Sequence, residues 1–508
     1  MKSPVPAGSD PAARLPPDHD RDGFWGRWCV RVALVGAILF LVVALWAVRR
    51  FTRDRPVTYA SIDDHFKYGS AGGERASGIP YSLWMALPEV FPEYLPGKGL
   101  QSLGFIYEPG RDLPIGVSKR NIQGIDRVFL TCAVCHVGTV RDTPASPPRI
   151  ILGMPANTVD LEGFQRFLTA CALDEKFTAD RLIPVIKRMG TDDAVNRLLL
   201  RLVGVDLMRD RLLMLRQRFT FMDHEPVFGP GRFDTFNPPK VLLNFRMDNL
   251  PEEERVGVCD FPSLWHQRQR RGLQLHWDGN NTDVDERNHS ASFGTGALPP
   301  TLDRAALQRT ADWELDAAPP AYPYPIDAAR AARGKPVYAA YCANCHGASG
   351  TDFHGELVGK VTSIDQIRTD RHRLDSYSWA LCVNQNLLYA AYPAERFSHF
   401  RKTNGYANMP LDGLWLRAPY LHNVSVPNLR ALLEPAARRP AAFYRGCDVY
   451  DPVNVGFVTD VATENGRPCF RYDTALPGNG NSGHEGRPYG TELAPEEKDD
   501  LVEYLKTF

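Results

Sequence analysis

The sequence lacks an excess of charge of either sign. Its 59 Lys and Arg residues balance 60 Asp and Glu residues, which leaves a formal net charge of -1. The composition therefore gives no argument for a nucleic-acid partner, and none is expected. With 41 Pro and 41 Gly among 508 residues, the chain is also poorly suited to a long-helix bundle or a regular α/β sheet. We expect short helices joined by many loops.

Long apolar runs are scarce, and the run from Val32 to Val48 is the candidate for a membrane span. Its roughly 17 residues make about 25 Å of helix, at the short end of a bilayer crossing. Because no small-residue cleavage site follows, we expect an uncleaved single-pass anchor over residues 29–50, with a signal sequence as the alternative. Arginines on both sides leave its orientation open on charge alone. Residues 1–28 are expected to form a disordered tail.

The clearest chemistry lies in two C-x-x-C-H patterns. One is Cys132, Cys135 and His136, and the other is Cys342, Cys345 and His346. Two thiols on one helical turn match the two vinyl groups of haem, and the adjacent histidine directs its imidazole at the iron. We therefore predict two covalently bound haem c groups, with both histidines as proximal iron ligands. Covalent haem is attached outside the cytoplasmic membrane, so we expect an inner-membrane anchor with the body in the periplasm.

Zinc binding and thiol redox chemistry fit the cysteine pairs less well. A four-thiolate zinc site would bring its pairs within about 20 residues of each other. A thioredoxin-like pair, or a disulfide between the two cysteines of a motif, leaves the following histidine unexplained in both copies. Among the remaining cysteines, Cys447 and Cys469 are the preferred disulfide because they bracket a short excursion, with Cys171 and Cys259 as the alternative pair.

A proline-rich segment, LDAAPPAYPYPI at residues 315–326, separates the two motifs. Its four prolines favour an extended linker. It would join an N-terminal haem domain, residues 56–314, to a C-terminal cytochrome c haem domain, residues 327–508. The predicted fold is mainly α, with two cytochrome c-like domains, long loops and the N-terminal membrane helix.

Four segments are expected to be helical. Residues 327–341 lead directly into the second motif, and residues 494–505 close the chain as an amphipathic helix with an acidic start. A haem-bearing helix and a terminal helix together suggest a cytochrome c core. In the first half we expect a comparable haem helix over residues 127–135, and a Leu- and Arg-rich helical stretch between residues 161 and 218.

Three longer passages are specific enough to compare with known families. They are Asn408–Leu432, with its A-P-Y-x-H motif, Asp260–Asn288, with H-W-D-G-N-N, and the Gly-rich loop Leu476–Gly486. Together they resemble the di-haem cytochrome c peroxidase superfamily, and most closely its rubber-oxygenase-like branch. The resemblance extends over most of residues 80–508. One departure is Val424, where the family usually has Gly, which puts the geometry of that loop in question.

The resemblance implies ligands on the far side of each iron. For the C-terminal haem it implies His484, while Met409, in a Met-Pro context typical of a thioether ligand, and His422 remain alternatives. For the N-terminal haem it implies that His276 faces the iron and that Arg287 polarises a bound oxygen species. His276 would act as a general base or as a sixth ligand that reduction releases.

Aromatic and charged residues surround these positions. Phe261, Trp265, Trp277, Asp278 and Glu286 are expected to form the wall of the N-terminal haem pocket. Trp265, Trp277 and Trp415 are candidates for an electron path, although a buried tryptophan usually serves packing. The resemblance also implies a calcium ion, Ca2+, between the domains, but no Asp-rich loop identifies its ligands.

These features predict a di-haem c-type cytochrome oxidoreductase. Its C-terminal haem would relay electrons from a donor protein or respiratory component to an N-terminal haem that reduces peroxide or activates dioxygen. Two alternatives remain open: a non-catalytic membrane-tethered electron carrier, and a dioxygenase acting on an apolar substrate. Oxygenases of the branch use an apolar distal residue, so a histidine at position 276 favours peroxide reduction.

Overall fold

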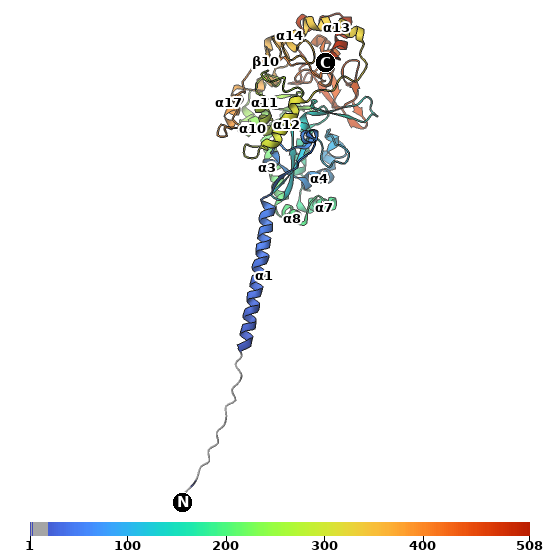
Figure 1. Ribbon diagram of the computed structural model, residues 1–508. Helices are drawn as coiled ribbons and strands as arrows, with labels where there is room; N and C mark the ends of the chain where they lie inside the picture. The colour runs from blue at the N-terminus through green and yellow to red at the C-terminus, as the bar shows by residue number, and fades with distance from the viewer. Residues whose placement is uncertain (2, 4–18) are drawn as a thin grey trace. The chain divides into compact units, whose positions relative to one another are not determined.

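The chain falls into two units, residues 1–54 and 55–508 (Figure 1). The computed structural model describes residues 1, 3 and 19–508. Most of the predicted disordered tail therefore lies outside the described residues. Helix α1 (His19–Phe51) begins before residue 29, so the prediction of disorder is wrong for residues 19–28. The last proline before the helix is Pro17, and nothing after it interrupts helix formation.

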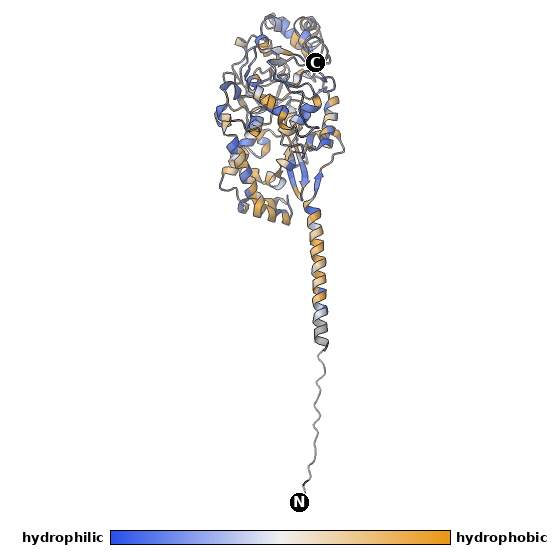
Figure 2. Cartoon of the chain, turned by 90° about the vertical axis from the view of Figure 1, so that its left-hand side faces the viewer, coloured by the Kyte–Doolittle hydropathy of each residue, from blue (hydrophilic) through white to orange (hydrophobic). Residues whose placement is uncertain are grey.

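Helix α1 contains the predicted apolar run. Its segment Trp25–Phe51 has 27 residues and a mean hydropathy of 2.5, and none of its most apolar window is buried (Figure 2). By length and composition it is able to cross a membrane, as a signal sequence also would be. Membrane insertion, single-pass topology and the periplasmic position of the body stay predictions.

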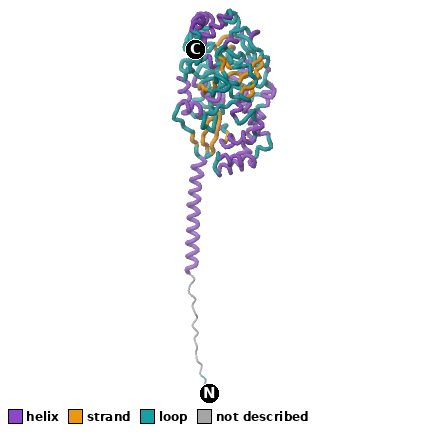
Figure 3. Tube along the Cα trace, turned by 90° about the vertical axis from the view of Figure 1, so that its right-hand side faces the viewer, coloured by secondary structure: helices purple, strands orange, loops and turns teal. Residues whose placement is uncertain are grey.

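Helix makes up 43% of the residues and strand 12%, so the prediction of a mainly α chain is confirmed. Loops join most of the short elements, as Figure 3 shows. The further helices are α2 (Ile62–Tyr68), α3 (Gly73–Ala76), α4 (Tyr81–Val90), α5 (Cys132–Cys135), α6 (Leu161–Leu173), α7 (Ala179–Met189), α8 (Ala194–Leu199), α9 (Val205–Arg218), α10 (Asn237–Leu242), α11 (Val284–Gly294), α12 (Arg304–Asp316), α13 (Ala328–Tyr341), α14 (Ala343–His346), α15 (Ile364–Ile367), α16 (His372–Ser376), α17 (Trp379–Leu388), α18 (Leu429–Leu432) and α19 (Pro495–Leu505).

The strands are short and pair antiparallel in small sheets. They are β1 (Asp54–Pro56), β2 (Ile79–Pro80), β3 (Val117–Ile122), β4 (Ile125–Leu130), β5 (Val137–Val140), β6 (Arg149–Leu152), β7 (Arg232–Asp234), β8 (Val258–Asp260), β9 (Val361–Ser363), β10 (Gly405–Ala407), β11 (Ala442–Arg445), β12 (Tyr450–Asp451), β13 (Gly456–Phe457), β14 (Thr463–Glu464), β15 (Arg467–Pro468) and β16 (Phe470–Asp473).

The first haem motif follows a strand rather than a long helix. Residues 127–130 belong to β4, which pairs with β3 from Ile122 opposite Ile125. The two residues of the turn, Gln123 and Gly124, both have positive φ, as a tight hairpin turn requires. The predicted helix over residues 127–135 is therefore wrong except for the single turn α5. A β-branched and aromatic run beside a hairpin turn favours a strand.

The second motif has the predicted pair of helices. Helix α13 leads into α14, and it packs against the terminal helix α19. Gly334 lies where the two helices cross, because a Cβ there would come within 2.0 Å of the carbonyl oxygen of Asp500. Arg333 pairs with the Asp500 carboxylate at 2.7 Å. The predictions for residues 327–341 and 494–505 are confirmed.

The segment between the halves is held at several points. Helix α12 includes the first two residues of the predicted linker, Leu315 and Asp316. Beyond it the chain is extended, and Trp415 donates a hydrogen bond to the carbonyl of Pro320, at 3.0 Å. Residues 55–508 form one compact unit. The division into two haem domains at this linker stays a prediction.

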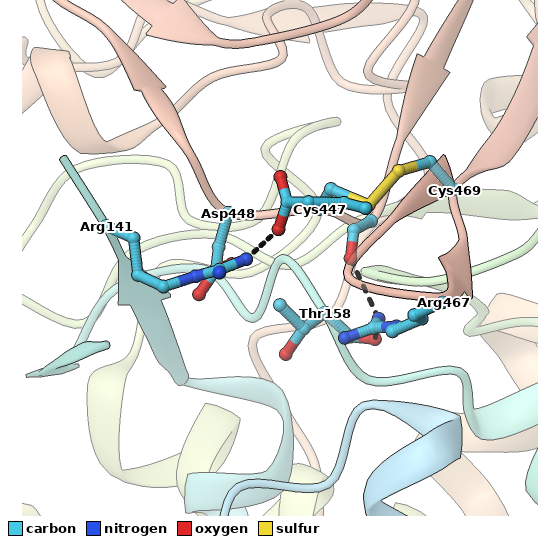
Figure 4. Close-up of a disulfide and its surroundings, with 8 residues drawn as sticks. Arg141, Thr158, Cys447, Asp448, Arg467 and Cys469 are labelled. Carbon is cyan, nitrogen blue, oxygen red and sulfur yellow. Dashed lines mark hydrogen bonds and ion pairs between the residues drawn. A yellow bond between two sulfur atoms is a disulfide. The ribbon is translucent and has the colours of Figure 1, made fainter. Parts of the chain in front are cut away.

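A disulfide lies where the two halves meet (Figure 4). Cys447 is bonded to Cys469, which confirms the preferred pairing. Arg141, from the first half, donates to the neighbouring Asp448 at 2.7 Å, and Arg467 donates to the carbonyl of Thr158 at 3.1 Å. The alternative pair, Cys171 and Cys259, consists of buried free thiols.

Candidate haem sites

The first proximal histidine is oriented by a backbone carbonyl. His136 directly follows α5, and its Nδ1 donates to the carbonyl oxygen of Pro262 at 2.9 Å. Because a carbonyl only accepts, the proton sits on Nδ1 and Nε2 keeps its lone pair, as a metal-binding histidine requires. Burial, with a smaller effect of Arg287, lowers the pKa of His136 to about 3, so the ring is neutral at pH 7.

The second proximal histidine has the same arrangement. The Nδ1 of His346 donates to the carbonyl oxygen of Met409 at 2.7 Å, and burial lowers its pKa. The four motif cysteines are free, not paired in disulfides. Both C-x-x-C-H patterns therefore present two thiols and a neutral imidazole with an available Nε2.

His484 faces His346 across a gap of defined width. The ring centres are 6.3 Å apart. A metal–imidazole bond of about 2.0 Å on each side of one ion separates the two ring centres by about 6 Å. Burial, and then the neighbouring His346, lower the pKa of His484 to about 3. Two neutral imidazoles at this spacing fit the two axial positions of a single iron.

A buried arginine holds the loop that carries His484. Arg439 donates to the carbonyl oxygens of Gly483, at 2.9 Å, and His484, at 3.2 Å. The backbone N–H of His484 donates to Ile367 at 2.8 Å. At Gly483, φ is +76° and a Cβ would come within 2.2 Å of the Arg368 carbonyl carbon, so only glycine fits. These contacts hold the loop against residues 367–369.

The two alternative ligands have other surroundings. Met409 offers its carbonyl to His346 on the proximal side, which is opposite His484. Met409 also lines the pocket that His276 and Arg287 line. The ring of His422 stacks on that of Tyr406, with the ring centres 4.0 Å apart, and its Nε2 is buried without a partner. Neither arrangement favours ligation of the second haem.

His276 lines the pocket beside the first proximal histidine. It directly follows Leu275, whose bridge to Asn281 closes a loop, and its φ is 63°. Its Nδ1 and the side-chain oxygen of Asn280 are 2.6 Å apart, which leaves Nε2 with a lone pair. Burial is the main cause that lowers the pKa of His276 to about 4. No histidine ring among the described residues pairs with His136 as His484 pairs with His346.

Arg287 lies on the wall of the same pocket. It belongs to the first turn of α11, which Asp283 caps. Its guanidinium donates to Gln267 at 2.6 Å and pairs with the buried Glu314 at 3.3 Å. These partners hold it in place. The structure therefore places His276 and Arg287 on the wall of one pocket, together with Pro262, whose carbonyl orients His136.

The other predicted wall residues divide into two groups. Phe261 and Trp277 line the cavity, and the indole N–H of Trp277 donates to the carbonyl of Asp260 at 2.9 Å. Asp278 pairs with Arg373 at 3.2 Å, and Glu286 accepts the backbone N–H of Ser398. These two carboxylates therefore support the fold around the pocket, and they are not among the residues that line it.

Two of the candidate tryptophans are in the core. Trp265 is fully buried, and its indole N–H donates to the carbonyl of Leu152 at 2.9 Å. Trp265 and Trp415 belong to one buried apolar cluster that joins both halves of the chain. Packing explains both side chains, and the electron path stays a prediction.

Buried positive charge lies on the wall of the cavity. Two adjoining pockets share Pro262, whose carbonyl orients His136, and Met409, whose carbonyl orients His346. Arg270 and Arg417 line the cavity and share one carboxylate, that of Asp412, and the Nε of Arg417 is buried without a partner. Two buried guanidinium groups on one carboxylate leave positive charge, which haem propionates would balance.

The surroundings of the thiols also fit thioether attachment. Burial raises the pKa of Cys132 and of Cys342 to about 12, so both are protonated at pH 7. Thiolate is the metal-binding form, and it is disfavoured at both positions. Within residues 19–508 and the two described N-terminal residues, no group of three or more His, Cys, Asp or Glu side chains is placed to hold a metal ion. The implied calcium site gains no support.

Several functional residues were not identified from the sequence. Asn280 orients His276, and its place four residues later in H-W-D-G-N-N was the available signal. Pro262 and Met409 act through their backbone carbonyls, which residue type does not reveal. Arg439 lies in an unremarkable Ala-Arg-Arg-Pro stretch, and nothing in the sequence indicates its contact with the His484 loop.

Comparison with known families adds a cytochrome c assignment. Residues 405–444 match the family model described as RoxA-like, cytochrome c-like. The match supports a RoxA-like cytochrome family, covalently bound haem and haem-based oxidoreductase chemistry. It covers the A-P-Y-x-H segment and the Met409 carbonyl that orients His346. The wider di-haem peroxidase superfamily and the number of haems stay predictions.

Two similar proteins come from Sinorhizobium fredii (strain NBRC 101917 / NGR234). "Uncharacterized protein y4iM" is 32% identical over 287 residues, 49% of this chain and 64% of that protein. The alignment thus spans less than two thirds of that relative. "Uncharacterized protein y4iJ" is 26% identical over 607 residues, 95% of this chain and 99% of that protein.

Val424, the departure from the family pattern, has φ of 58°, the left-handed conformation that favours glycine.

Proposed function

We propose that this protein is a membrane-tethered di-haem c-type cytochrome oxidoreductase that reduces peroxide. The observation that carries the proposal is the difference between its two histidine sites. His346 faces a second imidazole at 6.3 Å, whereas His136 bonds to Pro262, which lies on the wall of a pocket that His276 and Arg287 also line. One site is suited to electron transfer and the other to binding a small oxidant.

The C-terminal site would hold a haem with two histidine ligands. Its neighbours keep both rings neutral and hold the His484 loop against the body, so this site offers no open position. A closed, six-coordinate site passes electrons without binding substrate. We infer that it receives them from a donor protein or respiratory component and relays them to the first site.

The N-terminal site would hold a haem on His136. When bound, haem iron supplies redox chemistry and a position for peroxide or dioxygen. With its pKa at about 4, neutral His276 is able to take a proton from one peroxide oxygen and return it to the other. Arg287, fixed by Gln267 and Glu314, favours the negative charge that develops as the O–O bond breaks. One peroxide then takes two electrons and two protons to give two waters.

A second candidate function follows from His276 itself. If its Nε2 bound iron permanently, both sites would be closed and the protein would be an electron carrier. The position of His276 on the pocket wall, with a free Nε2, is the observation that favours this alternative. The polar side chains of Gln267, Arg270 and Arg287 on the same wall disfavour an apolar dioxygenase substrate.

Coordination number decides between these functions. The test records ultraviolet-visible and electron paramagnetic resonance spectra of the intact protein, oxidised and half-reduced, for wild type and His276→Ala. The exposed His354→Ala is the matched control. A high-spin haem in the wild type, in either state, supports the enzyme, and peroxide turnover with a reduced cytochrome donor is then measured. If both haems stay low-spin in every state and only His276→Ala opens a site, the electron carrier is correct.

A further inference from the structure

An exposed apolar surface runs along one continuous helical segment, from α8 through the π-helical residues 200–204 to α9. Figure 2 shows orange residues along helices on the outside of the body. We name this surface the apolar ridge. Its exposed members are Leu198, Leu202, Val203, Leu207, Met214 and Leu215.

The apolar ridge and the side of the segment that faces the core consist of different residues. Leu200, Val205, Met208 and Leu212 are buried and already pack into the largest apolar cluster of the body. Burial of one side explains an amphipathic helix, but it leaves the other side unexplained. Leu202 is 64% exposed. Six exposed apolar side chains on one helical segment of a folded body point to a site of interaction.

The charge of the segment identifies the partner. Residues 194–218 contain six arginines and two aspartates, a net charge of +4 in a chain whose formal net charge is -1. Arg201 and Arg216 pair with Asp180 and Asp223 from outside the segment, so the exposed Arg211 and Arg218 carry the charge that is left. Exposed apolar side chains beside arginines on a helix are typical of segments that lie in the surface of an anionic bilayer. An exposed apolar stripe on α17, Trp379, Val383 and Leu387, has no charged residue within its helix and lacks this pattern.

The same chain carries a helix suited to a bilayer. Helix α1 ends at Phe51, and the body unit begins at Arg55. Three residues reach about 10 Å when extended, so a bilayer that contained α1 would be within a short tether of the body. Such tethering raises the local concentration of lipid for a second, weaker contact.

We propose that the apolar ridge and its arginines bind the surface of a bilayer that contains anionic phospholipid. The apolar side chains would enter the boundary between headgroups and acyl chains, and the arginines would pair with lipid phosphates. The contact would hold the body in one orientation at the membrane. It is separate from the haem chemistry, because none of the ridge residues lines the cavity.

The test places a nitroxide on the ridge of the intact protein. Leu202→Cys is made on a Cys29→Ser background, since the other free thiols are buried or belong to the haem motifs. Leu387→Cys, 62% exposed on the uncharged stripe, is the matched control. Each protein is reconstituted in vesicles of phosphatidylcholine with or without 30% phosphatidylglycerol. Collision rates with oxygen and with a water-soluble nickel complex give the depth of each label.

We expect the oxygen-to-nickel ratio at position 202 to be at least threefold higher than at position 387 in phosphatidylglycerol vesicles. The difference should shrink at 0.5 M salt, and the double change Arg211→Glu with Arg218→Glu should reduce it. Equal ratios at the two positions would overturn the proposal. Spin–spin broadening at position 202 without a change in the ratio would also overturn it, because the ridge would then contact a second copy of the chain.

Discussion

Asp412 holds three basic side chains, two of which, Arg270 and Arg417, line the candidate cavity. Its carboxylate is 1% exposed, and it accepts hydrogen bonds from Arg270, Arg417 and, at 3.0 Å, the ring of His266. Burial acts to raise its pKa, but Arg270 and Arg417 outweigh burial and lower the pKa to about 2. Asp412 also lies three residues after Met409, whose carbonyl orients His346. The contacts of Asp412 therefore fix the segment next to Met409.

We expect the isosteric change Asp412→Asn to destabilise the body by about 3 kcal/mol at pH 7. The lowered pKa alone corresponds to about 2.4 kcal/mol, at 1.36 kcal/mol per unit below the ordinary value of 3.8. Leaving two buried guanidinium groups without their carboxylate costs about 3–5 kcal/mol. For a unit of this size, a loss of about 3 kcal/mol lowers the melting temperature by about 3 °C.

The assay is thermal unfolding of the intact protein, followed by circular dichroism at several pH values. Asp316→Asn is the control, because Asp316 pairs with Arg268 at 2.8 Å on the exposed surface, where such pairs contribute about 0–1 kcal/mol. The stabilisation from Asp412 is fully present above pH 3.8 and is lost as the pH falls toward 2. Equal melting temperatures for the two variants at pH 7 would refute the reasoning.

Three further outcomes are expected. Replacing Cys447 and Cys469 with alanine opens a loop with a sequence separation of 22, and urea titration should show a loss of about 3.4 kcal/mol. Arg439→Gln should loosen the His484 loop, so that cyanide binds the C-terminal haem, and an unchanged spectrum with cyanide would contradict the clamp. Burial lowers the pKa of His422 to about 3, so stability should fall below pH 6.5, by about 2 kcal/mol at pH 5. The His422→Gln variant should not show this fall in the free energy of unfolding between pH 6.5 and pH 5. The same pH dependence in the variant and the wild type would refute the role of His422.

Local patterns of the sequence predicted local structure well. The two C-x-x-C-H motifs, the helix pair α13 and α19 and the Cys447–Cys469 bond all depend on residues close together or on strong periodicity. The prediction of a helix over residues 127–130 was wrong, because it assumed that a helix leads into the haem motif, and these residues form part of β4. In the structure, the hairpin turn at Gln123 and Gly124 determines the strand instead.

Long-range contacts limited the prediction of the site. His136 and Pro262 are 126 residues apart in sequence, and the residues that support Arg287 come from two other segments. Backbone carbonyls have no residue preference, so the acceptors for His136 and His346 leave no trace in composition. The two halves on either side of the predicted linker share one apolar core, because Trp265 packs with residues of the second half. Sequence periodicity does not reveal such packing between distant segments.

His276 and His484, the candidate distal residues, share an unusual backbone conformation. His276 and His484 have φ of 63° and 47°, a conformation that costs a non-glycine residue about 1 kcal/mol or more. At His484, hydrogen bonds from Arg439 and to Ile367 hold the backbone. At His276, the body holds the loop as well, because the backbone N–H of Ala407 donates to the carbonyl of Trp277 and that of Arg401 donates to the carbonyl of Asn280, each at 2.8 Å. Both histidines are therefore fixed by the body. The two sites differ instead in what each histidine faces: His484 faces the ring of His346, whereas the Nδ1 of His276 contacts Asn280 in its own loop.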